Sequence, residues 1–454
     1  MEKANLKVGF GRVNITPPMG IFVAGYAVKR YADGVLDELE INAIALDDGN
    51  KKVVMLSIDN IGIAKAYYEE FKQTICEQVG LKREELFMHC THTHTGPALR
   101  PVSGEEELKM VEVYKDFVIK RCVDASKFAL ADLKPAKMGY GVAKAPNIAF
   151  IRRYRMKDGS VQTNPGVNNP NIVHPIGETD DNVGVIRFDR EGAETIVLAN
   201  FGCHPDTVGG TKISGDWPGF TRRFVEKAID NTKCILFNGA EGDVNHVNVH
   251  PNKGDFNDMF NDFDGCSRGY GHARHMGRVI AGAVMQVYDK VNYTDDTELK
   301  HMQRVYDIPA NVPDPKDMPL ARKYHELHLA GRDDEIPYKA MMLTTVVCEA
   351  GRMIRLENGP QSFPFLISAV VIGKVALLGI PGEPFNGIGR AIKETEGYDM
   401  ILPCCLVNSH EGYFPMQDSY DEGGYEARVS NFKAGVGEKI IAYSKEILTD
   451  LIKK

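Results

Sequence analysis

The sequence predicts an α/β protein with mixed central β-sheets flanked by helices. Short apolar runs alternate along the chain with segments that have the 3.6-residue period of amphipathic helices. Between residues 52 and 94 a strand, a helix and a second strand are expected in succession, an order typical of a sheet covered by helices. With 454 residues, 43% of them hydrophobic, the chain can bury one large core or two ordinary ones.

The first half of the chain predicts strands at residues 6–17, 39–46 and 52–58, with Asp48-Gly49-Asn50 as the turn between the last two. A helix is expected at 64–79, because apolar residues recur there every three or four positions, and a strand follows at 86–94. The same reasoning predicts a long helix at 105–133. Further strands are expected at 138–142, 183–189 and 195–202.

The second half predicts a helix at 218–229, a strand at 234–237 and a helix at 272–287. Residues 291–362 are rich in charges and interrupted by prolines, which indicates an insertion or lid-like subdomain within a single domain that spans residues 1–454. A hairpin at 365–371 and 375–380, a strand at 400–407 and a closing helix at 436–452 complete the expected fold.

The charge pattern and the length of the apolar runs exclude several functions. The chain has 54 basic and 62 acidic residues and no basic stripe, so nucleic acid is not an expected partner. No apolar run reaches the roughly 18 residues that span a bilayer, and residues 1–7 lack the apolar core of a signal peptide. Nine cysteines without paired spacing are typical of reduced thiols. We expect a cytoplasmic protein that binds a small-molecule substrate, with no membrane partner, and that can form a homo-oligomer.

A cluster of histidines ends the strand predicted at 86–94. Side chains two apart on a strand share a face, so His92 and His94 are expected to point the same way. Neutral imidazoles are common zinc ligands, and two on one face can begin a metal site. The alternative is that the histidines are polar residues that cap a strand. The cluster favours a metal site, although this stretch alone does not decide between the two interpretations.

Other polar residues follow the ends of other predicted strands, namely His204, Asp243, Glu383 and Tyr413. In open α/β sheets the carboxyl ends of the strands are where binding sites assemble. Histidines, a carboxylate and a phenol form a mixed nitrogen and oxygen site that suits Zn²⁺ with one position left for water. The same ligand types also accept Mn²⁺ or Fe²⁺.

Several short motifs occur in a fixed order along the chain. They are Ala24-Gly25-Tyr26-Ala27, Thr91-His92-Thr93-His94-Thr95-Gly96-Pro97, His204-Pro205, Gly242-Asp243-Val244, Pro381-Gly382-Glu383, Asn408-Ser409-His410-Glu411-Gly412-Tyr413 and Tyr425-Glu426-Ala427. This ordered set resembles the N-terminal catalytic domain of the neutral/alkaline (non-lysosomal) ceramidases, over most of the chain. The resemblance implies a ceramidase-like fold, and it implies zinc on His92, His204, Glu383 and Tyr413.

The resemblance also implies roles for neighbouring residues. His94 would be an imidazole beside the metal or against the substrate, Tyr425 would contact the reacting carbonyl, and Gly25 would line the pocket. Ceramidases carry a serine, described as catalytic, after Gly-Asp-Val, whereas this chain has Asn245, whose amide is no nucleophile. The sequence also lacks the immunoglobulin-like C-terminal domain of the family, so ceramide is not the expected substrate.

These observations predict a zinc-dependent hydrolase in which metal-bound water attacks the carbonyl of a small polar substrate. The bond would be an amide, a lactone or a cyclic ketone, as in sugar-acid or cyclitol catabolism. Arg152 or Arg153 would bind an anionic substituent, because the guanidinium fork suits carboxylate and phosphate. The alternatives are an N-acyl amidase related to the lipid amidases, and a non-catalytic metal-containing binding protein.

The remaining predicted site residues have roles in proton transfer and charge stabilisation. His94 or Asp243 would transfer protons, and His246 would assist. Asn245 and Tyr425 would stabilise the negative charge that develops on the carbonyl oxygen.

Overall fold

The computed structural model describes residues 6–261 and 266–453. Within them, the largest sheet has nine strands in two halves. One half contains β1 (Lys7–Asn14), β5 (Glu40–Asp47), β6 (Lys52–Ile58) and β7 (Leu86–Cys90), and the other contains β8 (Lys134–Lys144), β13 (Asn182–Arg190), β14 (Thr195–Phe201), β16 (Thr232–Asn238) and the added strand β20 (Asn292–Thr294). A short antiparallel pairing of β1 with β8 joins the two halves.

A second sheet of four strands packs against the first. It contains β21 (Leu299–Pro309), β22 (Ser362–Ile372), β23 (Val375–Gly379) and β25 (Met400–Cys404). Its apolar inner face shares one buried core with both halves of the large sheet, and Met55, Ile186, Leu198 and Leu377 are among the residues of this core. Both faces of these sheets are covered, which explains why their strands read as nearly continuous apolar runs.

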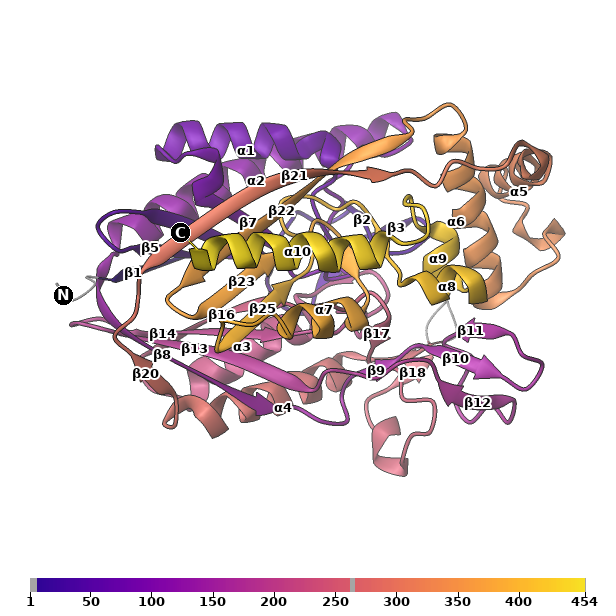
Figure 1. Ribbon diagram of the computed structural model, residues 1–454. Helices are drawn as coiled ribbons and strands as arrows, with labels where there is room; N and C mark the ends of the chain where they lie inside the picture. The colour runs from indigo at the N-terminus through magenta and orange to yellow at the C-terminus, as the bar shows by residue number, and fades with distance from the viewer. Residues whose placement is uncertain (1–5, 262–265, 454) are drawn as a thin grey trace.

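Helices cover the outer faces of both halves of the large sheet and of the second sheet (Figure 1). The helices α1 (Lys65–Val79) and α2 (Glu105–Ala131) share a buried core with β5, β6 and β7, whereas α3 (Asp216–Ala228) and α4 (Tyr270–Tyr288) share one with β13, β14 and β16. The second sheet is covered by α7 (Asn386–Lys393) and α10 (Val436–Lys453). The predicted class, mixed sheets flanked by helices, is therefore confirmed.

The segment between β21 and β22 contains the helices α5 (Met318–Leu329) and α6 (Ala340–Leu356), which pack on each other through two small apolar clusters. The insertion expected at about 291–362 thus overlaps the second sheet, since β21 pairs with β22 from Leu299 to Pro309. The helix α6 also packs against α9 (Tyr425–Val429), and the two lie side by side in Figure 1.

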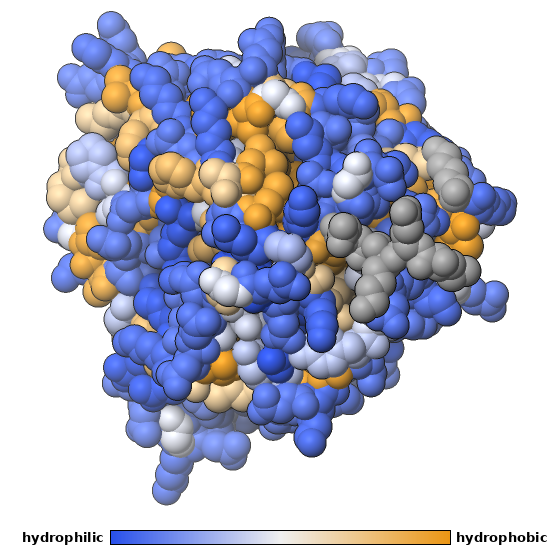
Figure 2. Space-filling view, turned by 90° about the vertical axis from the view of Figure 1, so that its left-hand side faces the viewer, coloured by the Kyte–Doolittle hydropathy of each residue, from blue (hydrophilic) through white to orange (hydrophobic). Residues whose placement is uncertain are grey.

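The molecular surface is mainly polar. Figure 2 shows a mostly hydrophilic face on which apolar side chains form separate patches. Among the described residues, none of the helices combines the length and the apolar content that a membrane crossing requires.

Candidate metal centre

One buried asparagine holds together the strand ends from which the site is built. Asn238 is the last residue of β16, and its Nδ2 donates to the carbonyl of Thr91 after β7 and to that of Cys203 after β14, both at 3.1 Å. Its own carbonyl accepts a hydrogen bond of 3.0 Å from the backbone nitrogen of Cys405, directly after β25. The ends of four strands therefore meet at Asn238, and the loops that follow them are brought side by side.

The prediction that a strand continues to His94 is wrong, because β7 ends at Cys90. His92 has a φ of 77°, in the left-handed region, and its backbone nitrogen donates to the carbonyl of Asn60 at 2.9 Å. The backbone nitrogen of His94 in turn donates to the carbonyl of Pro205 at 3.1 Å. The rings of His92 and His94 lie 4.9 Å apart through this turn, not through the alternation of a strand.

Five predicted side chains converge in this loop cluster. The Nε2 atoms of His92 and His94 are 3.3 Å apart, and Glu383 Oε2 lies 3.4 Å from Nε2 of His92 and 3.2 Å from Nε2 of His204. The hydroxyl of Tyr413 is 3.4 Å from Nε2 of His204. The strands β24 (Glu383–Pro384) and β26 (Tyr413–Phe414) are paired in parallel, which sets Glu383 opposite Tyr413.

These distances fit a bound cation. Bonds of about 2.0–2.1 Å to a tetrahedral zinc ion would place its ligand atoms about 3.3–3.4 Å apart. Nδ1 of His92 donates to the carbonyl of Ile61 at 2.6 Å, and Nδ1 of His204 donates to that of Glu241 at 2.9 Å. Each Nε2 therefore presents a lone pair to Glu383 Oε2, a buried oxygen that accepts no hydrogen bond from the described residues. A cation between these atoms removes the repulsion, so the site suits a divalent ion with nitrogen and oxygen ligands.

The electrostatics of the cluster also favour a cation. Burial alone would lower the pKa of His204, but the neighbouring carboxylates of Glu241 and Glu383 outweigh burial and raise that pKa to about 10. The pKa of His92 is raised for the same reason. In contrast, burial and the neighbouring positive charge of His92 hold the pKa of His94 well below its usual value. The carboxylates thus create a negative potential at the Nε2 atoms of His92 and His204, while His94 stays neutral.

Two residues that contact the cluster were missed by the sequence reasoning. Glu241 is fully buried and its carboxylate contacts Nδ1 of His204, while Nε2 of His410 lies 2.8 Å from Glu383 Oε1. Acceptors on the far nitrogen of a ligating histidine fix the ring and raise its basicity. Both residues lie within or beside the ordered motifs, in which the predicted site residues are Asp243 and Tyr413.

Asp243, predicted to transfer protons, lies at the start of α7. Its Oδ1 accepts a hydrogen bond of 2.7 Å from the backbone nitrogen of Asn386, the first residue of that helix. Burial raises the pKa of Asp243 to about 6. The structure therefore places this carboxylate where it stabilises a helix terminus, whereas Glu241, two residues earlier, contacts the cluster.

We expect Glu241→Gln to weaken metal affinity by about 10–100-fold, because a neutral amide makes His204 a poorer ligand than a carboxylate does. Asp243→Asn is the matched control, since its amide oxygen can still accept from Asn386 and it removes the same charge two residues away. Competition with a chromophoric chelator measures both affinities. Equal affinities for the two variants would contradict the assignment of Glu241.

The predicted arginines differ in their position. Arg152 lies 5.4 Å from the ring centroid of Tyr413, and its Nε donates to Glu426 at 2.7 Å. Arg153 donates instead to Glu422 at 3.2 Å. Both side chains are almost fully buried and already paired with carboxylates, so Arg152 contacts the cluster through Tyr413 while Arg153 lies outside it.

The remaining predicted residues, Tyr425, Asn245 and His246, lie around the cluster. The Tyr425 ring is 5.7 Å from that of Tyr413. Asn245 is fully buried, and its amide donates to the side chain of Asn164 at 3.3 Å. His246 has acceptors at both ring nitrogens, Asp206 at 3.1 Å and the carbonyl of Ser267 at 2.7 Å. Tyr425 thus reaches the cluster directly, while the contacts of His246 hold it in a separate polar group.

Gly25 packs directly against His94. A Cβ added at Gly25 would lie 2.9 Å from the Cα, Cβ and Cγ atoms of His94, and the φ of Gly25 is 111°. We expect Gly25→Ala to cost about 1–3 kcal/mol more in free energy of unfolding than Gly20→Ala. Gly20 is the matched control, because its φ is 81° and nothing lies within 4 Å of an added Cβ. Urea denaturation of the two variants tests this, and equal losses would contradict the packing.

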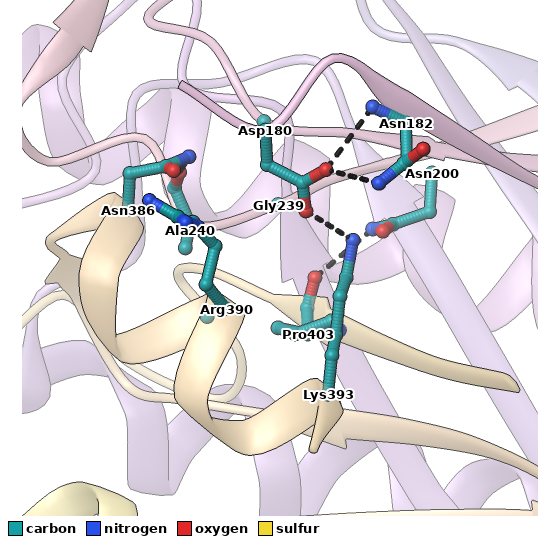
Figure 3. Close-up of a pocket in the computed structure, with 11 residues that line it drawn as sticks. Asp180, Asn182, Asn200, Gly239, Ala240, Asn386, Arg390, Lys393 and Pro403 are labelled. Atoms are coloured by element: carbon teal, nitrogen blue, oxygen red, sulfur yellow. Dashed lines mark hydrogen bonds and ion pairs between the residues drawn. The ribbon is translucent and has the colours of Figure 1, made fainter. Parts of the chain in front are cut away.

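A separate polar pocket lies beside α7 (Figure 3). Lys393 donates to Asp180 at 2.5 Å, and the side chain of Asn182 donates to the same carboxylate at 2.7 Å. Its lining comprises Asp180, Asn182, Asn200, Gly202, Gly239, Ala240, Asn386, Gly389, Arg390, Lys393 and Pro403. This lining includes none of the predicted site residues. Its charged groups are already paired, Lys393 with Asp180 inside the pocket and Arg390 with Glu178 outside it. The histidine cluster therefore remains the candidate site.

Comparison with known proteins shows the fold that carries this cluster. No protein-family model matches the chain. The structure of neutral ceramidase from Pseudomonas aeruginosa superimposes with a TM-score of 0.70 at 16% sequence identity, covering 100% of this chain and 75% of that one. A structure of ceramidase complexed with C2 gives a TM-score of 0.69 at 16% identity, covering 99% and 75% of the two chains. The chain therefore has the ceramidase catalytic-domain fold that its motifs predicted.

Proposed function

We propose that this protein is a metal-dependent hydrolase, with zinc as the expected ion, that cleaves a bond at the carbonyl of a small polar substrate. The observation that carries the proposal is the convergence of His92, His204, Glu383 and Tyr413 at the spacing of metal ligands. Such an ion supplies acidification of water and polarisation of a carbonyl. The ceramidase-like fold supports hydrolysis as the reaction class.

The residues of the chain then have distinct tasks. His94 is buried beside His92, its pKa is lowered, and its Nδ1 has no hydrogen-bond partner among the described residues, so its neutral imidazole can accept a proton. Arg152 places a positive charge beside the Tyr413 ring. Tyr425 packs against Tyr413 and is partly exposed, so its hydroxyl can donate to the oxygen that gains negative charge in the reaction.

A second candidate is an N-acyl amidase, which the fold of the ceramidases favours. Asn245 stands where the motif of that family has serine, so this amidase would act without a serine nucleophile. We propose the broader hydrolase first, because the buried amide of Asn245 is engaged with Asn164 and leaves the cluster as the reactive centre.

A substrate panel of amides, esters, lactones and cyclic ketones tests the proposal on protein loaded with zinc, manganese or iron. We expect turnover in one class, lost on chelation, restored by metal and absent from Glu383→Gln. Activity confined to acyl amides would favour the second candidate. Absence of turnover in every class, on protein shown to hold the ion, would contradict both.

A further inference from the structure

Two arginines near the cluster have no acidic partner. Arg100 and Arg355 are both exposed, and neither forms an ion pair with any residue in 6–261 or 266–453. Arg355 makes one weak side-chain contact, 3.5 Å from Nη2 to the amide oxygen of Asn431. The arginines predicted to bind an anion, Arg152 and Arg153, are by contrast buried and paired with glutamates.

A short chain of contacts connects these arginines to the metal centre. Cys348, on α6, lies close enough to both guanidinium groups and to the hydroxyl of Tyr425 for each of them to lower the pKa of its thiol, against the burial that raises it. The Tyr425 ring contacts Tyr413 at 5.7 Å. Arg100 and Arg355 therefore lie on the side of the cluster where the partly exposed Tyr425 packs against Tyr413.

The fold brings the two arginines together from distant parts of the sequence. Arg100 follows Leu99, whose carbonyl accepts a hydrogen bond of 3.0 Å from Ala64, in the loop that also carries the histidines. Arg355 lies in the last turn of α6, seven residues beyond Cys348 and hence on the same side of that helix. The packing of α6 on α9 holds this side next to Tyr425.

The acidic residues beside Arg355 are already paired elsewhere. On the same helix, Glu349 pairs with Arg428, and Glu357, just after the helix, pairs with Arg322 at 2.5 Å. Although both side chains are exposed to solvent, partial desolvation by the surrounding protein lowers the pKa of Arg100 and of Arg355, and the charge of Arg100 lowers the pKa of Arg355 further. The fold thus holds two positively charged guanidinium groups close together at a place that solvent reaches, and a bound anion would relieve their repulsion.

We propose that Arg100 and Arg355 bind an anionic oxyacid group of the substrate, either a carboxylate or a phosphate, while the carbonyl to be cleaved reaches the metal centre past Tyr425. The guanidinium fork is suited to both groups. This inference rests on the proposed hydrolase function and narrows its substrate class to anionic molecules. It also separates this protein from an enzyme for neutral lipid amides.

Binding of inorganic phosphate and of acetate to the metal-loaded full-length chain tests the anion site at constant ionic strength by calorimetry. We expect saturable binding of one probe, at least 10-fold weaker in both Arg100→Gln and Arg355→Gln. Arg278→Gln is the control, because Arg278 is an exposed arginine on α4 without an ion pair among the described residues. The preferred probe tells whether the group is a phosphate or a carboxylate.

A metal-site variant distinguishes the two proposals. If phosphate or acetate still binds to His204→Ala, the anion is bound by the arginines. If binding is lost in His204→Ala but is retained in both arginine variants, the anion is bound by the metal, and this inference is overturned. Equal binding in wild type and the arginine variants, or no saturable binding, also overturns it. In each of these cases metal-dependent turnover on neutral substrates would leave the proposed hydrolase standing.

Discussion

His204→Ala is expected to abolish stoichiometric metal binding. The Nε2 of His204 lies 3.2 Å from Oε2 of Glu383 and 3.4 Å from the hydroxyl of Tyr413, so its removal leaves these two ligands without a shared partner. Four-ligand zinc sites contribute about 10–16 kcal/mol of binding free energy, so losing one ligand should weaken affinity by about a hundred- to a thousandfold. Elemental analysis after dialysis measures the retained metal.

The matched control for this variant is His174→Ala. His174 is an exposed histidine on β12 (Ile172–Pro175), and its ring contacts a backbone carbonyl. It should retain the wild-type amount of metal. If both variants keep their metal, or both lose it, the ion is not held by His204 and the proposed centre is misassigned.

Asn238→Asp should destabilise the fold strongly, although it exchanges one nitrogen for one oxygen. The Nδ2 of Asn238 donates to two carbonyls, those of Thr91 and Cys203, in a fully buried position. A carboxylate would set a negative charge against both carbonyl oxygens, at a cost of about 3 kcal/mol or more in free energy of unfolding. Urea denaturation followed by circular dichroism measures the loss.

Asn50→Asp makes the same chemical change in an exposed turn, and we expect it to change stability by less than about 0.5 kcal/mol. The loss in Asn238→Asp should be accompanied by weaker metal binding, because Asn238 joins the strand ends that precede His92 and His204. A fully stable Asn238→Asp protein would show that these strand ends are held by other contacts.

Much of the fold could be predicted because its strands are apolar runs of ordinary length. The positions of β5, β6, β13, β14 and β16 follow from such runs, and α1, α2 and α10 follow from their periodic apolar faces. The secondary structure of the segment at about 291–362 was the most difficult to predict. The strand β21 has partly exposed positions along most of its length, so its sequence contains no continuous apolar run.

Which residues form the candidate site could be predicted more accurately than how they are arranged. His92, His204, Glu383 and Tyr413 could be found as polar residues after apolar strands, and the structure brings them together. The turn at His92 could not be predicted, because nothing in the local sequence requires a histidine with left-handed backbone angles. The turn is held by a hydrogen bond from the backbone nitrogen of His92 to the carbonyl of Asn60.

The contacts around the site depend on long-range packing. The local sequence does not distinguish Glu241 from other acidic loop residues, because its contact with His204 forms only in the folded structure. Arg100 and Arg355 are 255 positions apart in the chain, and no local pattern joins them. Arg152 and Arg153 looked suited to a ligand, but each is already paired with a glutamate.

The measurement that tests the central claim most directly is X-ray absorption spectroscopy at the zinc edge, on zinc-loaded full-length protein with its metal content determined. The geometry predicts about one ion per chain, bound by nitrogen and oxygen atoms at about 2.0–2.1 Å with the outer scattering of imidazole rings. A shell of sulfur at about 2.3 Å, or no stoichiometric ion after loading, would contradict a centre built from His92, His204, Glu383 and Tyr413.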